Sequence, residues 1–257
     1  MIYLYGLVAS EETASIRTTM AKVQGLVGMV ELAAMGGVHL IFEPHEGGEI
    51  LPRRRSLLTH ARVLETAMDA GTVLPMRFGM TCASVGDVEA LLERDSHKIR
   101  GAFQNIENHV EFGVRVVAPE AETLATTLEM RPDLKATRDR LSTRGAEAHF
   151  SKVDFGRALG DAAAERRAQA QKTILSALRP MASDHLLKAP ESDFDLLRAE
   201  FLVKTQDAEA FSDRLDHVVS KLDIAGGAPC QARIVGPGPA FHFVDLSLDL
   251  PVTKDAA

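Results

Sequence analysis

The chain has 257 residues, of which 46% are hydrophobic and 25% charged, a composition typical of a globular protein. The net charge of −7, with Arg53-Arg54-Arg55 as the one basic cluster, argues against nucleic-acid binding. No apolar run approaches the roughly 20 residues of a membrane-spanning helix, and Cys82 and Cys230 stand in no metal or redox spacing. We expect a reduced, cytoplasmic protein.

The first predicted element is a strand over residues 1–8. Met1 leads directly into apolar residues without a basic segment, so we interpret this stretch as a strand and not as a signal peptide. Alternation places Ile2, Leu4 and Val8 on one face and Tyr3, Tyr5 and Leu7 on the other. A strand that is apolar on both faces is typical of the centre of a sheet that is covered on both sides.

The next elements predict a ferredoxin-like unit. A helix carrying Ile16 and Met20 is followed by strands over 29–35 and 38–42, and Gly36-Gly37 between them is a hairpin signal. A second helix begins near Ser56 and ends at Gly71, before a strand within 71–79. This β-α-β-β-α-β order is that of the ferredoxin-like unit, with extra helices and one extra strand after it.

The fourth strand of this unit, 71–79, is expected at a sheet edge. Pro75 has no N–H for a ladder hydrogen bond, which is tolerated at an edge. Arg77 is a charge within an apolar run, and two interpretations remain open. It forms a structural ion pair or extends from the edge into solvent, or it faces a partner.

Two short helices beginning at Ser84 and Ser96, and a half-exposed fifth strand over 109–117, complete the predicted N-terminal domain, 1–130. The first strand requires a cover on its second face, where we expect Tyr3 and Tyr5, either packed in the core or in contact with a partner. The second domain, the two short helices or a partner are the alternatives for that cover.

The second predicted domain, 131–257, begins with helices. Its longest helical piece, 146–178, predicts either a helical hairpin or short coiled coil, or ordinary helices packed on a sheet. Strands over 184–188 and 194–204, a helix over 208–222 and a strand over 230–235 follow. This α-β-β-α-β series resembles the first domain without its leading strand. The fold class is therefore α+β with two domains.

The sequence offers little chemistry. It contains no phosphate loop, nucleophile elbow or zincin motif, and its nine histidines are scattered singly. His60, on the second helix, is interpreted as a satisfied or half-buried histidine. We predict no catalytic residue, no metal and no cofactor.

Four stretches, in this order, resemble the gas vesicle protein F/L (GvpF/GvpL) family. They are Tyr3-Leu4-Tyr5-Gly6, His60 to Gly79 with its Leu-Pro-Met-Arg-Phe-Gly block, Val110 to Val116, and Gly236-Pro237-Gly238-Pro239-Ala240-Phe241-His242-Phe243-Val244. The last stretch departs from the family pattern, which has Trp, Pro and Tyr where this chain has Gly238, Ala240 and Phe241. The match covers nearly the whole chain.

The resemblance implies an accessory or minor structural protein of gas vesicle formation, without enzymatic activity, located at the vesicle or in the cytoplasm. Its expected partners are the small, very apolar shell subunit and other accessory proteins, bound through a sheet edge or the second face of the sheet. The candidate contact residues are Tyr3, Tyr5, Pro75, Arg77, Phe241 and Phe243. The alternative is a small-molecule enzyme on a ferredoxin-like scaffold, which requires a polar pocket joining His60, Arg77 and Glu111.

Overall fold

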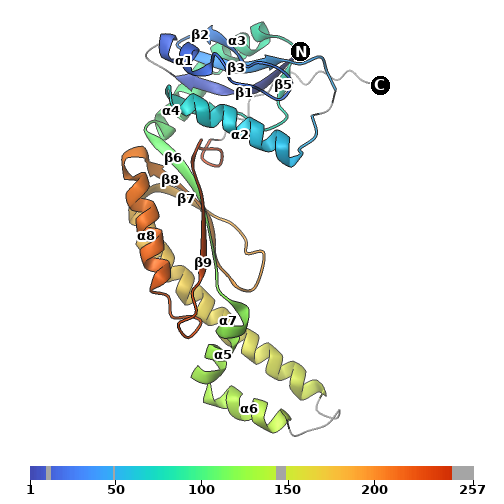
Figure 1. Ribbon diagram of the computed structural model, residues 1–257, viewed down its shortest axis with the longest axis vertical. Helices are drawn as coiled ribbons and strands as arrows, with labels where there is room; N and C mark the ends of the chain where they lie inside the picture. Colours follow the sequence, from blue (N-terminus) through green and yellow to red (C-terminus); the bar gives the residue numbers. More distant parts are fainter. Residues whose placement is uncertain (10–12, 49, 143–148, 245–257) are drawn as a thin grey trace. The chain divides into compact units, whose positions relative to one another are not determined.

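The structure is a computed structural model that describes residues 1–9, 13–48, 50–142 and 149–244 (Figure 1). The chain divides into two compact units. Unit 1 contains residues 1–111 together with the segment that begins at Pro237, and unit 2 contains residues 112–236.

Unit 1 is built on an antiparallel sheet. Its elements are β1 (Ile2–Ala9), α1 (Thr13–Met20), β2 (Glu31–Met35), β3 (Val38–Pro44), α2 (Arg54–Met68) and β4 (Thr72–Pro75). The strand order is β2-β3-β1-β4, and β5 (Thr81–Cys82) also pairs with β1. This order confirms the ferredoxin-like prediction, with β1 central and the strand that contains Pro75 at an edge.

A bulge in β1 decides which side chains lie beneath the helices. The register with β3 shifts between Leu4 and Gly6, so simple alternation fails there. As a result Val8 shares a face with Tyr3 and Tyr5. Those three pack with core residues of α1 and α2, namely Ile16, Met20, Val63, Leu64 and Ala67. The prediction that the tyrosines lie on the second face is therefore wrong.

The second face of the sheet is covered by the two short helices, α3 (Val85–Arg94) and α4 (Ser96–Ile106). Helix α4 contacts β4, and α3 contacts β2 and β5. The Ser84 side chain caps α3 by accepting a hydrogen bond from the Asp87 N–H, as the sequence predicts. Of the three covers considered, the chain's own short helices fulfil this role.

Strand β4 ends earlier than predicted. Pairing with β1 stops at Pro75, opposite Gly6, and the N–H of Met76 then donates to the carbonyl of Tyr5 at 2.9 Å. The chain turns beyond this point, and Gly79 adopts a positive φ of 89°. Arg77 therefore lies in an exposed turn and not in the strand.

Unit 2 repeats the strand order of unit 1. Its helices and strands are β6 (His109–Val117), α5 (Glu120–Met130), α6 (Pro132–Ser142), α7 (His149–Leu178), β7 (Ala182–Leu187), β8 (Asp195–Lys204), α8 (Ala208–Ser220) and β9 (Gln231–Gly238). Short 3-10 turns lie at Arg179–Met181 and Thr205–Asp207. The first residues of β6, up to 111, and the last residues of β9, from 237, are counted in unit 1. The sheet order is β7-β8-β6-β9. If β6 is counted as the first strand of this sheet, the spatial order is second-third-first-fourth, the same as β2-β3-β1-β4 in unit 1.

Strand β6 is thus the leading strand that the second domain lacked in the sequence interpretation. It was predicted as a fifth strand of the first domain, but it pairs in the second sheet. The division between the units consequently lies at 111/112 and differs from the predicted boundary at 130/131. Residues 237–244 return to unit 1.

Both interpretations of the long helix are partly correct. The C-terminal half of α7 packs on α8 and β8, where Ile174 and Leu178 are fully buried (Figure 1). Helix α7 also contacts α5 and α6, so helices pack on one another within unit 2 as well. Within the described residues, no helix is both long enough and apolar enough to cross a bilayer.

Candidate functional site

Three of the four motif stretches meet in unit 1. The ring of His60 lies 5.7 Å from those of Tyr3 and Phe78 and 6.2 Å from that of Phe241, measured between centroids. Tyr3 and Tyr5 are in edge contact at 4.9 Å. Three segments far apart in the chain therefore form one aromatic cluster around a histidine, and Tyr3 and His60 alone are separated by 57 positions.

His60 is hydrogen-bonded at both ring nitrogens. Its Nε2 lies 3.0 Å from the carbonyl oxygen of Met76, which only accepts, so Nε2 carries the proton. Nδ1 then accepts from the hydroxyl of Tyr3 at 2.7 Å. The Tyr3 oxygen in turn accepts from the N–H of Gly79. The network fixes the turn after β4, and the interpretation of His60 as a satisfied buried histidine is confirmed.

Burial sets the protonation of this network. It lowers the pKa of His60, although the bond to the Met76 carbonyl acts in the opposite direction. Burial also raises the pKa of Tyr3 to about 12, against the hydrogen bond from Gly79. Neutral imidazole and neutral phenol are therefore the forms that the fold stabilises.

We expect unit 1 to lose stability as the pH falls below about 6.5, the usual pKa of histidine. The unfolded chain then binds a proton that folded His60 binds less readily, and the slope from this residue is at most about 1.4 kcal/mol per pH unit. Urea unfolding at pH 7.5, 6 and 5 measures the effect. In His60→Gln this part of the pH dependence should disappear, and an unchanged slope in that variant would contradict the assignment.

Tyr5 and Glu43 form a second buried network. The carboxylate of Glu43, at the end of β3, is fully buried and accepts from the Tyr5 hydroxyl at 3.0 Å. It also accepts from the N–H groups of Leu26, Val27 and Gly28 at 3.1, 3.2 and 3.1 Å. Burial and the nearby Glu43 charge raise the pKa of Tyr5. One carboxylate thus holds the loop between α1 and β2 against the sheet.

The six predicted contact residues differ in burial. Tyr3 and Tyr5 are fully buried and Pro75 is buried, so these three support the interior of unit 1 and cannot form an exposed contact surface. Arg77 is exposed, while Phe241 and Phe243 are half-buried. The structure thus brings Tyr3, Tyr5 and Phe241 into one cluster.

Glu43 was missed by the sequence interpretation. Its signal is a lone carboxylate directly after the apolar residues Leu40, Ile41 and Phe42, in a strand where a charge is out of place. The residues required by the enzyme alternative have separate surroundings: His60 bonds Tyr3 and Met76, Glu111 bonds His242, and Arg77 is exposed.

The two fourth strands differ in accessibility. In β4, Val73 and Leu74 are at most 4% exposed, so that edge is covered. In β9 every residue from Gln231 to Pro237 is exposed, including Ile234 and Val235, and β9 ends the strand order of its sheet. An uncovered edge presents unpaired backbone donors and acceptors to another strand. The candidate functional site is therefore the exposed edge of β9.

Residues 1–245 match the family model described as "Gas vesicle synthesis protein GvpL/GvpF". The chain is 28% identical to gas vesicle protein F of Streptomyces sp. (strain CB03234), over 95% of this chain and 99% of the relative. It is 25% identical to gas vesicle protein F of Nostoc sp. (strain PCC 7120), over 86% and 90%.

The fold is shared with crystal structures. The crystal structure of GvpF from Anabaena sp. PCC7120 matches with a TM-score of 0.81 at 23% identity, covering 96% of this chain and 98% of that chain. The GvpF structure from Microcystis aeruginosa gives 0.74 at 21% identity, covering 94% and 98%. These two matches bear on the fold alone.

Proposed function

Because the chain belongs to the gas vesicle synthesis protein GvpL/GvpF family, its role lies in gas vesicle formation, and we propose that it binds the small apolar shell subunit before or during polymerisation. A free subunit of that kind exposes unpaired strands and an apolar face, and both promote aggregation. A protein that occupies such a strand transiently keeps the subunit competent for assembly.

The observation that carries this proposal is the exposed edge of β9. Strand addition supplies main-chain hydrogen bonds, and neighbouring apolar side chains add to the contact. Ile234 and Val235 are 37% and 64% exposed. They are consecutive residues of β9, so their side chains point to opposite faces of the sheet at this edge. An added apolar strand would cover both. Arg77, Phe241 and Phe243 remain predicted contacts outside this edge.

Val235→Lys should weaken binding of the shell subunit by roughly tenfold, since an edge lysine opposes strand addition and removes an apolar contact. Co-expression with the shell subunit from the same gene cluster, followed by pull-down, measures the soluble complex. The variant should retain the fold because the substituted side chain is exposed.

Met130→Lys is the matched control, because Met130 on α5 is also 64% exposed but lies on a helix. It should retain the complex at the level of the unmodified chain. Equal retention by Val235→Lys and Met130→Lys would exclude the β9 edge. Absence of any complex with the unmodified chain would contradict shell-subunit binding itself.

A further inference from the structure

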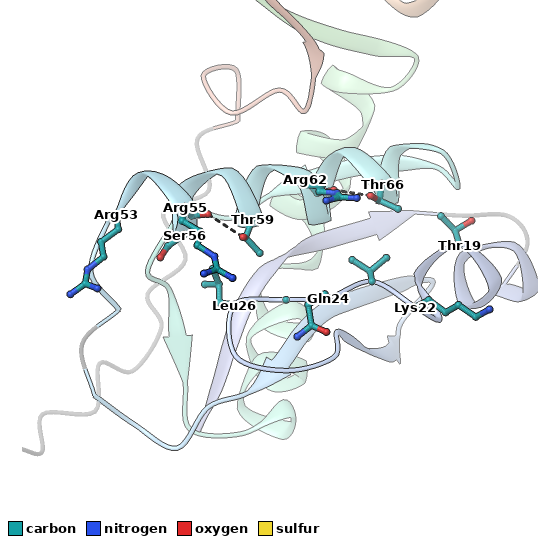
Figure 2. A pocket seen from close by; sticks show the side chains of 12 residues that line it. Thr19, Lys22, Gln24, Leu26, Arg53, Arg55, Ser56, Thr59, Arg62 and Thr66 are labelled. Carbon is teal, nitrogen blue, oxygen red and sulfur yellow. Dashed lines mark hydrogen bonds between the residues drawn. The ribbon is translucent and has the colours of Figure 1, made fainter.

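A groove in unit 1 carries positive charge in a chain whose net charge is −7. Its volume is about 740 Å³, and it lies between α2 and the loop that follows α1 (Figure 2). Four cationic side chains line it: Lys22, Arg53, Arg55 and Arg62. Within the part of the chain that the structure describes, none of the four has an ion-pair partner.

The α2 wall follows one face of the helix. Arg55, Thr59, Arg62 and Thr66 recur at spacings of four, three and four residues, so they lie on one side of α2, and Figure 2 shows Arg55 directed toward Leu26. At 1.5 Å per residue the backbone positions of Arg55 and Arg62 are about 10 Å apart along the axis. The charges are thus spread along the groove and do not converge on one point.

The opposite wall is held in place by the Glu43 network. Gly25 and Leu26 line the groove, and Leu26, Val27 and Gly28 donate to the buried carboxylate of Glu43. A Cβ at position 25 would lie 2.2 Å from Glu43 Oε2, so only glycine fits there. This wall is consequently preorganised, which limits the entropy lost when a ligand binds.

We propose that this groove binds an acidic peptide segment of a partner protein, at a site independent of β9. Separated arginines fit separated carboxylates, whereas a single phosphate would require cations that converge on it. Val23 and Leu26 add apolar side chains to the wall opposite α2, where side chains between the acidic residues can pack. Among the residues that the structure describes, the lining includes no aromatic side chain on which nucleic-acid bases would stack.

The test uses a fluorescent peptide of about ten residues with Glu at every third position and Leu and Ser between, because a polyproline II segment turns once in three residues and so brings these Glu side chains to one face, about 9 Å apart. Anisotropy with the full chain at about 50 mM salt, where charges are weakly screened, measures binding. The peptide should bind at least tenfold more tightly than its Glu→Gln counterpart. No binding by the Glu peptide, or equal binding by the two peptides, overturns the proposal.

The double variant Arg55→Glu/Arg62→Glu should bind the Glu peptide at least tenfold more weakly than the unmodified chain. The matched control is Arg17→Glu/Arg54→Glu, which makes the same charge change at exposed arginines outside the groove lining, one of them on α2. Equal loss in both double variants would show a non-specific charge effect and overturn the site. Tighter binding of a single-stranded oligonucleotide than of the peptide would overturn the assigned ligand.

The shell-subunit pull-down separates this proposal from strand addition. Arg55→Glu/Arg62→Glu should retain the shell subunit, and Val235→Lys should retain the acidic peptide. Loss of both ligands in either variant would contradict two independent sites.

Discussion

Glu43→Leu is expected to destabilise unit 1 by about 4 kcal/mol. The change leaves the N–H groups of Val27 and Gly28 and the Tyr5 hydroxyl without their acceptor, whereas the Leu26 N–H keeps the Tyr5 oxygen at 2.9 Å. Each unsatisfied group that stays buried costs about 1–3 kcal/mol. The loop between α1 and β2 recovers part of this by moving toward water. Urea unfolding followed by tyrosine fluorescence measures the loss, because Tyr3 and Tyr5 are the only tyrosines and the chain has no Trp.

Glu31→Leu is the control for this substitution. Glu31 begins β2, pairs with Phe42 beside Glu43, and is exposed. Its replacement should change the free energy of unfolding by no more than about 0.5 kcal/mol. A loss below about 1 kcal/mol in Glu43→Leu would contradict the role of Glu43 as the acceptor that holds the loop.

The strand order of unit 1 could be predicted because local signals agree with it. Gly36 and Gly37 have φ values of 50° and 92°, the left-handed conformations that a tight hairpin requires. Pro75 restricts its strand to an edge. Such signals act within a few residues, so a single sequence contains them.

The assignment of β6 to its sheet could not be predicted in the same way. Alternation along residues 109–117 identifies a strand but carries no information about its neighbours. The partners of β6 are β8 and β9, which lie far along the chain. Its position in the sequence led us to assign β6 to the sheet of unit 1, whereas in the structure it pairs within the sheet of unit 2.

The candidate site shows the same limit. The motif aromatics Tyr3, Tyr5 and Phe241 were candidates for contact with a partner, with core packing as the alternative for the two tyrosines, and in the structure all three pack around His60 or beside it. A buried aromatic cluster and an exposed aromatic contact have the same composition in a sequence. The exposure of β9 depends equally on what covers each edge, which periodicity does not report.

Gly6→Ala is expected to destabilise unit 1 by about 3 kcal/mol. A Cβ at this position would lie 2.6 Å from the carbonyl oxygen of Leu74 and 2.9 Å from Leu64 Cδ2. The first of these is backbone of the paired strand β4, so β1 and β4 would have to separate near the bulge. This close approach explains why glycine follows the second tyrosine in the N-terminal motif.

Gly101→Ala is expected to have the opposite effect on the free energy of unfolding, measured by the same tyrosine fluorescence. Gly101 lies within α4, and a Cβ there would meet nothing within 4 Å. Alanine should therefore stabilise unit 1 by about 0.5–1 kcal/mol through the better helix propensity and a less flexible unfolded chain. A similar loss in both variants would show that unit 1 is sensitive to any added methyl group, whereas opposite signs would locate the constraint in the contact between β1 and β4.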